Sequence, residues 1–416
     1  MIHFKISAPG RMSLFGEHAV KHKKNSITAS IDLRTTMTFT DLSHLPSKNN
    51  IEIDFPQIYL HLNIPLQEFL KFYNKSIQNI TLLREQIVRF TNSLYSPRHR
   101  KEIVQTFYYL LVYILYKEQI TISSFKIYVS TKFMIDEEFA CLSSFTVCLT
   151  ACLLHWSRVQ KGITGKFQNT DFQKIQSYAA RCEEISPASG MIDVTACVYG
   201  SIIEHRIRIM TLISLHKMPK IMILLIDSKV TQNLDCQTQR VTELMNIFPT
   251  IGNLILKNID IVTIMAHNIL RKINKMYNVN NISLKHISQK NEELNRYKLN
   301  LLFYTFLSQI YINHNQKLLQ MLGVSYDRLD KICAIAQKFK LFGKYTDIGN
   351  GRYAYIWCPL YTNKEIFIEL LWDELKKYDC DIMKVYLSCC GVKIESEIES
   401  ACSKEAVVCC DEHSNK

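Results

Sequence analysis

The sequence predicts an α+β fold in two domains. Segments that alternate between apolar and polar residues, as antiparallel strands do, are mixed with segments of helical periodicity. The 416 residues suffice for two domains of ordinary size. Hydrophobic residues make up 47% of the chain and charged residues 21%, a balance typical of a globular protein and not of a disordered one.

Strands are expected in several segments along the chain. Alternation and enrichment in Thr and Ile predict them, and a turn is expected at Pro9–Gly10. The expected strands cover residues 3–9, 13–18, 26–42, 51–62, 123–130, 202–209, 220–228, 351–360 and 380–388.

Helices are expected in between, above all in the second half. Serines at the start of 143–160 and Ser325 ahead of 326–339 are suited to cap helices. The expected helices cover residues 66–95, 99–119, 143–160, a segment ending near 179–186, 234–247, 253–276, 290–321, 326–339 and 362–377. From about residue 397 the chain is polar and charged, and we expect a loose tail there.

Composition argues against several classes of protein. The longest dense apolar stretch, residues 108–116, is far shorter than the roughly 20 residues of a membrane span. The first residues lack the pattern of a secretion signal, and the 14 cysteines follow no repeated spacing, so we expect reduced thiols in the cytoplasm. The formal charge of +12 is dispersed, which argues against a nucleic-acid partner and leaves either a solvated surface or a basic rim that attracts a polyphosphate.

The most unusual segment is SAPGRMSLFGEHAV, residues 7–20. The chain has only 12 glycines, yet Gly10 and Gly16 flank a segment with Arg11, and Glu17 and His18 follow directly. A guanidinium near a carboxylate suits a substrate anion or a transferring phosphoryl group. The alternative is a surface salt bridge.

A second candidate is Asp193 in ASGMIDVTACVYG. It follows a Ser-Gly turn and enters an apolar helical segment, where a carboxylate can orient or deprotonate a hydroxyl. The alternative is that Asp193 only caps the helix.

Two further segments concern anion binding. Residues 130–144 connect a strand to a helix, whose N-terminus favours anions, but this loop has no glycine and carries three acidic residues at 136–138. Near the C-terminus, Gly343, Gly349 and Gly351 lie within nine residues. They indicate either a backbone that approaches a ligand closely or a simple β-hairpin turn.

Taken in order, these segments resemble the GHMP kinases, the family of galactokinase, homoserine kinase and mevalonate kinase. APGRMSLFGEHAV is similar to the opening motif of the family, and SIDLRT after it fits as well. Within the family the resemblance is closest to the mevalonate kinases, and it covers most of residues 4–395. The segments that carry it are CLSSFTVCLTACLLHW, ILLIDSKVTQN, FPTIGNLILKNID and the run from Asn313 to Lys344.

The resemblance implies a fold and a reaction. The fold would be an N-terminal domain like domain 2 of ribosomal protein S5 over residues 1–215, a ferredoxin-like C-terminal domain over 216–396 and a polar tail over 397–416. The reaction would be transfer of phosphate from ATP, with Mg²⁺, to the 5-hydroxyl of mevalonate. A homodimer is also expected.

The family motifs also imply roles for single residues. Asp193 falls at the catalytic Asp and Arg11 at the basic residue that supports it, while Glu17 and His18 match residues that line the substrate pocket. The nucleotide side departs from the family. Its glycine-rich loop appears here as MIDEEFACLSSF, so either Cys141 and Leu142 or, with a slip of two, Ser143 and Ser144 take the place of its serines.

The remaining motifs are also altered. Gly343 lies in a shortened third motif, KLFGKYTDIGNG, and Glu183 and Glu184 are the candidates to hold Mg²⁺. Two alternatives follow from the altered nucleotide side and from the galactokinase-like spacing of SGMID. One is a pseudokinase that binds a small molecule or a protein, and the other is a GHMP kinase for another hydroxylated substrate.

Overall fold

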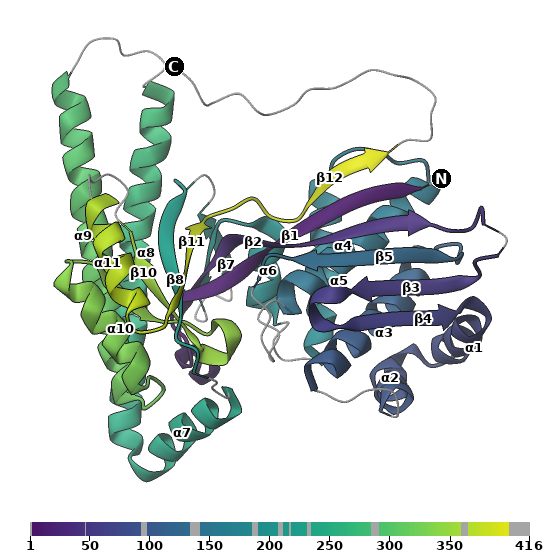
Figure 1. The fold of residues 1–416 in the computed structure, drawn as a ribbon, viewed down its shortest axis with the longest axis horizontal. Helices are drawn as coiled ribbons and strands as arrows, with labels where there is room; N and C mark the ends of the chain where they lie inside the picture. The colour runs from purple at the N-terminus through teal and green to yellow at the C-terminus, as the bar shows by residue number, and fades with distance from the viewer. Residues whose placement is uncertain are drawn as a thin grey trace.

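The computed structural model describes the chain in ten stretches. These are residues 2–45, 47–92, 98–133, 142–184, 190–206, 211–215, 218–230, 234–283, 291–358 and 365–398. Within them one large mixed sheet runs through the molecule, and helices gather at its two ends (Figure 1). The α+β prediction is confirmed.

The strands are short except for the first two. They are β1 (His3–Phe15), β2 (Ser26–Asp41), β3 (Asn50–Phe55), β4 (Leu60–Pro65), β5 (Phe125–Thr131), β6 (Ile202–Arg206), β7 (Thr211–Leu215), β8 (Ile221–Asp227), β9 (Phe342–Tyr345), β10 (Tyr353–Trp357), β11 (Asp381–Leu387) and β12 (Lys393–Ile398). The main order is β4-β3-β5-β2-β11-β8-β10-β9, with β1 between β2 and β12, and β6 between β2 and β7.

The helices include two very long ones. They are α1 (Leu66–Ile77), α2 (Leu83–Thr91), α3 (Arg98–Glu118), α4 (Leu142–Gln160), α5 (Asn169–Ala180), α6 (Met191–Tyr199), α7 (Leu234–Ile247), α8 (Pro249–Ser283), α9 (Asn291–Met321), α10 (Asp327–Lys338) and α11 (Glu365–Lys376). The expected helix over 66–95 is divided, because a 3-10 turn at Ile80–Leu82 separates α1 from α2.

Two hydrophobic cores support the sheet. One lies under β3, β4 and β5 and includes α3 and α4; the side chains of α4 are buried from Leu142 to Arg158. The other lies between β8–β10 and the helices α8–α11, which Figure 1 shows at the opposite end. Residues of β1 and β2 contribute to both cores, so these two strands join the halves of the molecule. The domain boundary at residue 215 stays a prediction.

The turn expected at Pro9–Gly10 is wrong. β1 continues through these residues as one strand of 13, and only its register with β2 shifts there. Proline has no N–H to donate, so a shift in the ladder at this point costs little. Gly10 is needed for space, because a Cβ at this position would lie 2.1 Å from the ring of Phe133.

Other expectations also need correction. The capping residue of α10 is Tyr326, and the Ser325 hydroxyl instead donates to Asp330, at 2.5 Å.

The short strand β7 was not expected. Nor was β12, which pairs with β1 as far as Ile398 and so orders the start of the segment predicted to be loose. The sequence pattern did not predict β12 because its residues are largely polar, and a strand at the edge of a sheet does not need to be apolar. Residues 399–416 lie outside the described residues. In the described part of the chain, no helix combines the length and the apolar character that a membrane span requires.

Replacing Gly16 by Ala should destabilise the protein strongly. Gly16 has φ +85° and an added Cβ would lie 2.3 Å from the carbonyl oxygen of Asn25. We expect a loss of about 2 kcal/mol or more in the free energy of unfolding, measured by urea denaturation. The matched control is Gly162→Ala, with φ +72° but no atom within 4 Å of the added Cβ. It should lose only about 1 kcal/mol, and equal losses would contradict the role of the close approach.

Candidate active site

Arg11 lies in the second half of β1, on the same face as Ser13. Side chains two residues apart on a strand point to the same side, so the two reach the same partners. The Arg11 side chain is 18% exposed and contacts two carboxylates. A guanidinium stays charged under all conditions relevant to proteins, so Arg11 is a fixed positive charge in this region.

The first carboxylate is that of Asp193. It lies in the first turn of α6, and its Oδ2 is 2.9 Å from Nη2 of Arg11. The capping position of α6 is Gly190, so the alternative reading of Asp193 as the capping residue is wrong. The structure therefore brings together the two residues that the sequence analysis named as catalytic, although they lie far apart in the sequence.

The second carboxylate, Asp347, was not predicted. Its Oδ2 accepts from Nη1 of Arg11 and, at 2.9 Å, from the Ser13 hydroxyl, and its Oδ1 accepts from the Ser13 N–H at 3.1 Å. Burial alone would raise the pKa of Asp347, but the charge of Arg11 and the bonds from Ser13 outweigh it and lower this pKa to about 2. Asp347 is therefore a stable anion beside Arg11.

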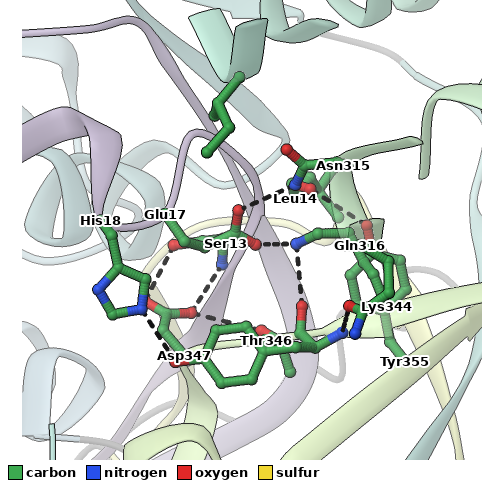
Figure 2. Close-up of polar contacts among 12 residues, drawn as sticks. Ser13, Leu14, Glu17, His18, Asn315, Gln316, Lys344, Thr346, Asp347 and Tyr355 are labelled. Atoms are coloured by element: carbon green, nitrogen blue, oxygen red, sulfur yellow. Dashed lines mark hydrogen bonds and ion pairs between the residues drawn. The ribbon is translucent and has the colours of Figure 1, made fainter. Parts of the chain in front are cut away.

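Next to this group lies a buried polar network. Glu17 forms an ion pair with Lys344 of β9, and both side chains are buried, at 1% and 0% exposure. Lys344 also donates to the carbonyl of Tyr345 at 2.9 Å, and Asn315 of α9 donates to Glu17 at 3.3 Å. Figure 2 shows these side chains turned toward one another. Burial raises the pKa of Glu17, and the charge of Lys344 opposes that rise.

His18 follows directly and is also buried. Its Nε2 lies 3.3 Å from the hydroxyl of Tyr345, which donates in turn to Gln237 at 2.8 Å. Burial, together with the charge of Lys21, lowers the pKa of His18 to about 4, so the ring is neutral near pH 7. Glu17 and His18 were expected to line the substrate pocket, and the structure places both within the network that ties the end of β1 to β9.

The residues expected to bind the nucleotide begin α4. Leu142, Ser143 and Ser144 form its first turn and are buried, and the Ser144 hydroxyl lies 2.6 Å from that of Thr35. Cys141 and the three acidic residues at 136–138 lie outside the described residues.

Gly343 is in β9, where it pairs with Ile356 of β10. A Cβ there would meet the carbonyl of Tyr355 at 2.6 Å, so its close backbone neighbour is the adjacent strand, as the hairpin alternative predicts.

The described residues supply no evident metal site. Among them, no group of three or more His, Cys, Asp or Glu side chains could hold a metal ion. Glu183 and Glu184 lie in the 3-10 turn Arg181–Glu184 that follows α5, and their side chains are not among those described.

Sequence reasoning missed Lys344, Asp347 and Asn315. Lys344 and Asp347 belong to the segment from Lys340 to Gly351, which was singled out for its glycines. A usable signal was present, because two charges next to a short apolar strand near a turn indicate partners elsewhere in the fold. Asn315 lies within a long helix of polar and apolar residues and carried no signal of its own.

Removing the Lys344 charge should destabilise the fold. In Lys344→Met the buried Glu17 loses its counter-charge, and we expect a loss of about 3 kcal/mol or more in the free energy of unfolding. The double variant with Glu17→Gln should recover part of that loss. The control is Lys229→Met, whose partner Asp379 is 82% exposed, and its loss should be much smaller than that of Lys344→Met. A double variant less stable than Lys344→Met would show that the pair is not coupled.

His18 should make stability depend on pH. Its pKa is 6.5 when unfolded and about 4 when folded, so below pH 6.5 the unfolded chain takes up a proton that the folded chain does not. The free energy of unfolding should fall as the pH drops from 7 to 5. In His18→Asn this fall should be about 2 kcal/mol smaller than in the wild-type protein. Asn suits the φ of +57° at this position. Burial also lowers the pKa values of His155 and His267 to about 4, and their contribution to the pH dependence is the same in both proteins. Equal slopes in the two proteins would contradict a neutral His18.

Comparison with known proteins gives consistent relatives. No family model matches the chain. Mevalonate kinase of Mus musculus is 24% identical over 361 residues, which cover 83% of this chain and 84% of that protein. The human enzyme is 23% identical over 361 residues, covering 83% of each. Mevalonate kinase of Dictyostelium discoideum is 47% identical over a shorter stretch of 55 residues, 13% of each chain.

Solved structures agree with the fold. Mevalonate kinase of Methanococcus jannaschii superimposes with a TM-score of 0.62 at 19% identity, over 92% of this chain and 98% of that one. The L. major enzyme in complex with R-mevalonate gives 0.61 at 14% identity, over 92% and 95%. Galactokinase of Lactococcus lactis gives 0.56 at 14% identity, over 94% of each. By sequence and by fold, this chain is similar to the mevalonate kinases of the GHMP kinase family.

Proposed function

We propose that this protein transfers the γ-phosphoryl group of ATP to the 5-hydroxyl of mevalonate. The observation that carries the proposal is the 2.9 Å contact between Arg11 and Asp193, which places a fixed positive charge beside a carboxylate, as phosphoryl transfer can use. Homology to the mevalonate kinases supports a small-molecule kinase. The choice of mevalonate as the substrate rests on the same relatives.

Asp193 would act on the attacking hydroxyl. A carboxylate within hydrogen-bond reach of that hydroxyl can orient it and accept its proton. The position of Asp193 in the first turn of α6 suits this role, because an acidic side chain is favoured there and the guanidinium of Arg11 supplies a counter-charge.

Arg11 would act on the transferring group. Negative charge spreads over the phosphoryl oxygens in the transition state, and a guanidinium already held in place stabilises it without reorganising. The β1–β2 ladder fixes the backbone of Arg11 opposite Ser30, and the network of Glu17 and Lys344 anchors the end of the same strand. Glu17 and His18, which are both buried, would then contribute by holding β1 in place.

The residues of α4 fit a nucleotide phosphate. The first turn of this 19-residue helix has no acidic side chain, and the dipole of a helix favours an anion at its N-terminus. ATP, when bound, supplies the phosphoryl group that is transferred. The Ser144 hydroxyl is 1% exposed and already bonded to Thr35, so backbone amides are the better candidates for this contact.

The described residues alone form no magnesium site. Arg11 engages both nearby carboxylates, and the described side chains form no group of three or more ligands. No step proposed for this chain therefore uses Mg²⁺. The magnesium ion, the homodimer and the cytoplasmic location stay predictions.

The proposal predicts mevalonate-dependent formation of ADP. In a coupled assay with Mg²⁺ and ATP, mevalonate should be turned over, whereas galactose, homoserine and phosphomevalonate should not. Asp193→Asn should lower kcat by about 10²- to 10⁴-fold, because it removes the proton acceptor and keeps the shape. The control is Asp373→Asn, an exposed residue of α11.

Each other outcome has a clear meaning. Turnover of a different acceptor would identify a GHMP kinase for another substrate. No turnover across the panel would contradict the proposed activity. Calorimetry with an ATP analogue would then test whether the protein still binds nucleotide, as a binding protein derived from a kinase could.

A further inference from the structure

Asp347 is the residue of the site that neither the sequence motifs nor the proposed reaction account for. It lies between β9 and the 3-10 turn η6 (Ile348–Gly351), far from Arg11 in sequence. Its side chain is 20% exposed and forms an ion pair with Nη1 of Arg11, while Nη2 of the same guanidinium faces Asp193. Arg11 therefore bridges two carboxylates through its two terminal nitrogens.

The contacts of Asp347 hold its carboxylate rigidly. Oδ1 accepts from the Ser13 N–H at 3.1 Å and from the Thr346 hydroxyl at 3.3 Å. Oδ2 accepts from the Ser13 hydroxyl at 2.9 Å and from Arg11. Because two donors come from Ser13, two residues beyond Arg11 on β1, Asp347 is locked to the same strand that carries the guanidinium (Figure 2 shows Asp347 beside Ser13).

The backbone supports this arrangement from the other side. The Thr346 N–H donates to the carbonyl of Tyr353 in β10 at 3.0 Å, and the preceding Lys344 is fixed by its buried pair with Glu17. The Asp347 backbone is thus attached to the sheet directly before its side chain reaches β1. The Asp347 residue is therefore fixed both through its backbone and through its carboxylate. A carboxylate held in this way can orient a flexible guanidinium, whereas a carboxylate on a mobile loop cannot.

A single contact with Asp193 would leave the guanidinium underdetermined. Arginine has several rotatable bonds, and one ion pair is compatible with several orientations of its planar head group. A second carboxylate on the other terminal nitrogen selects one of them. Asp347 also makes the summed formal charge of the three side chains −1, so its presence does not increase the attraction for an anionic substrate. Its contribution is orientation.

We propose that Asp347 is a positioning residue that holds the Arg11 guanidinium in the orientation that faces Asp193. The consequence for catalysis rests on the proposed function, whereas the orientation itself is a property of the folded chain. Asp347 need not touch substrate for this role.

The first experiment is a double-mutant cycle on stability, read as the urea midpoint at pH 7. Asp347→Asn should lower the midpoint in the wild-type background, because Arg11 loses a partner. In the Arg11→Gln background the same change should leave the midpoint unchanged or raise it, because it then removes an unpaired carboxylate beside Asp193. An equal decrease in both backgrounds would overturn the proposal.

The second experiment measures turnover of mevalonate. Asp347→Asn should lower kcat by about 10- to 100-fold while the KM for mevalonate changes less than about twofold, because a misplaced guanidinium weakens the transition state more than substrate binding. Asp379→Asn, the same substitution in an exposed pair with Lys229, is the control. An unchanged kcat despite coupling in the cycle would overturn the positioning role. If the wild-type protein shows no turnover, the proposed function fails, and the stability cycle still decides whether Asp347 holds Arg11.

Discussion

The charge of Arg11, shared between Asp193 and Asp347, is the interaction on which the candidate site depends. It joins three segments that are far apart in the sequence: the strand β1, the first turn of α6 and the link between β9 and η6. A guanidinium can do this because its donors lie in a planar fork and it never loses its charge. Without this residue two partly buried carboxylates would lose the counter-charge that they share.

The fold prepares this interaction through β1. The first half of the strand packs into the core that contains α3 and α4, and its second half packs into the core of α8–α11. The buried pair of Glu17 and Lys344 then fastens the end of β1 to β9, which fixes the approach of Asp347. The site therefore lies where the two cores meet, and small displacements of either half would change the distance between Arg11 and its partners.

Much of the fold and half of the site could be predicted from the sequence. Strong helical periodicity placed most helices of the second half within a few residues, although α8 continues to Ser283, beyond the predicted end at 276. Arg11 and Asp193 were identified because a guanidinium and a carboxylate in these motifs point to one chemistry. The charges of Lys344 and Asp347 indicated partners elsewhere in the fold but not which ones, and Asn315 is an ordinary polar residue of α9 until the fold brings it to Glu17. The continuous β1 was missed because a Pro-Gly pair indicates a turn locally, whereas pairing with β2 and β12 overrides it.

The most direct test of the central claim is a crystal structure of the protein with mevalonate and a non-hydrolysable ATP analogue. We predict that the 5-hydroxyl lies within about 3 Å of the Asp193 carboxylate and that the terminal phosphate contacts Arg11. A hydroxyl beyond hydrogen-bond reach of Asp193, with the phosphate bound away from Arg11, would contradict the account.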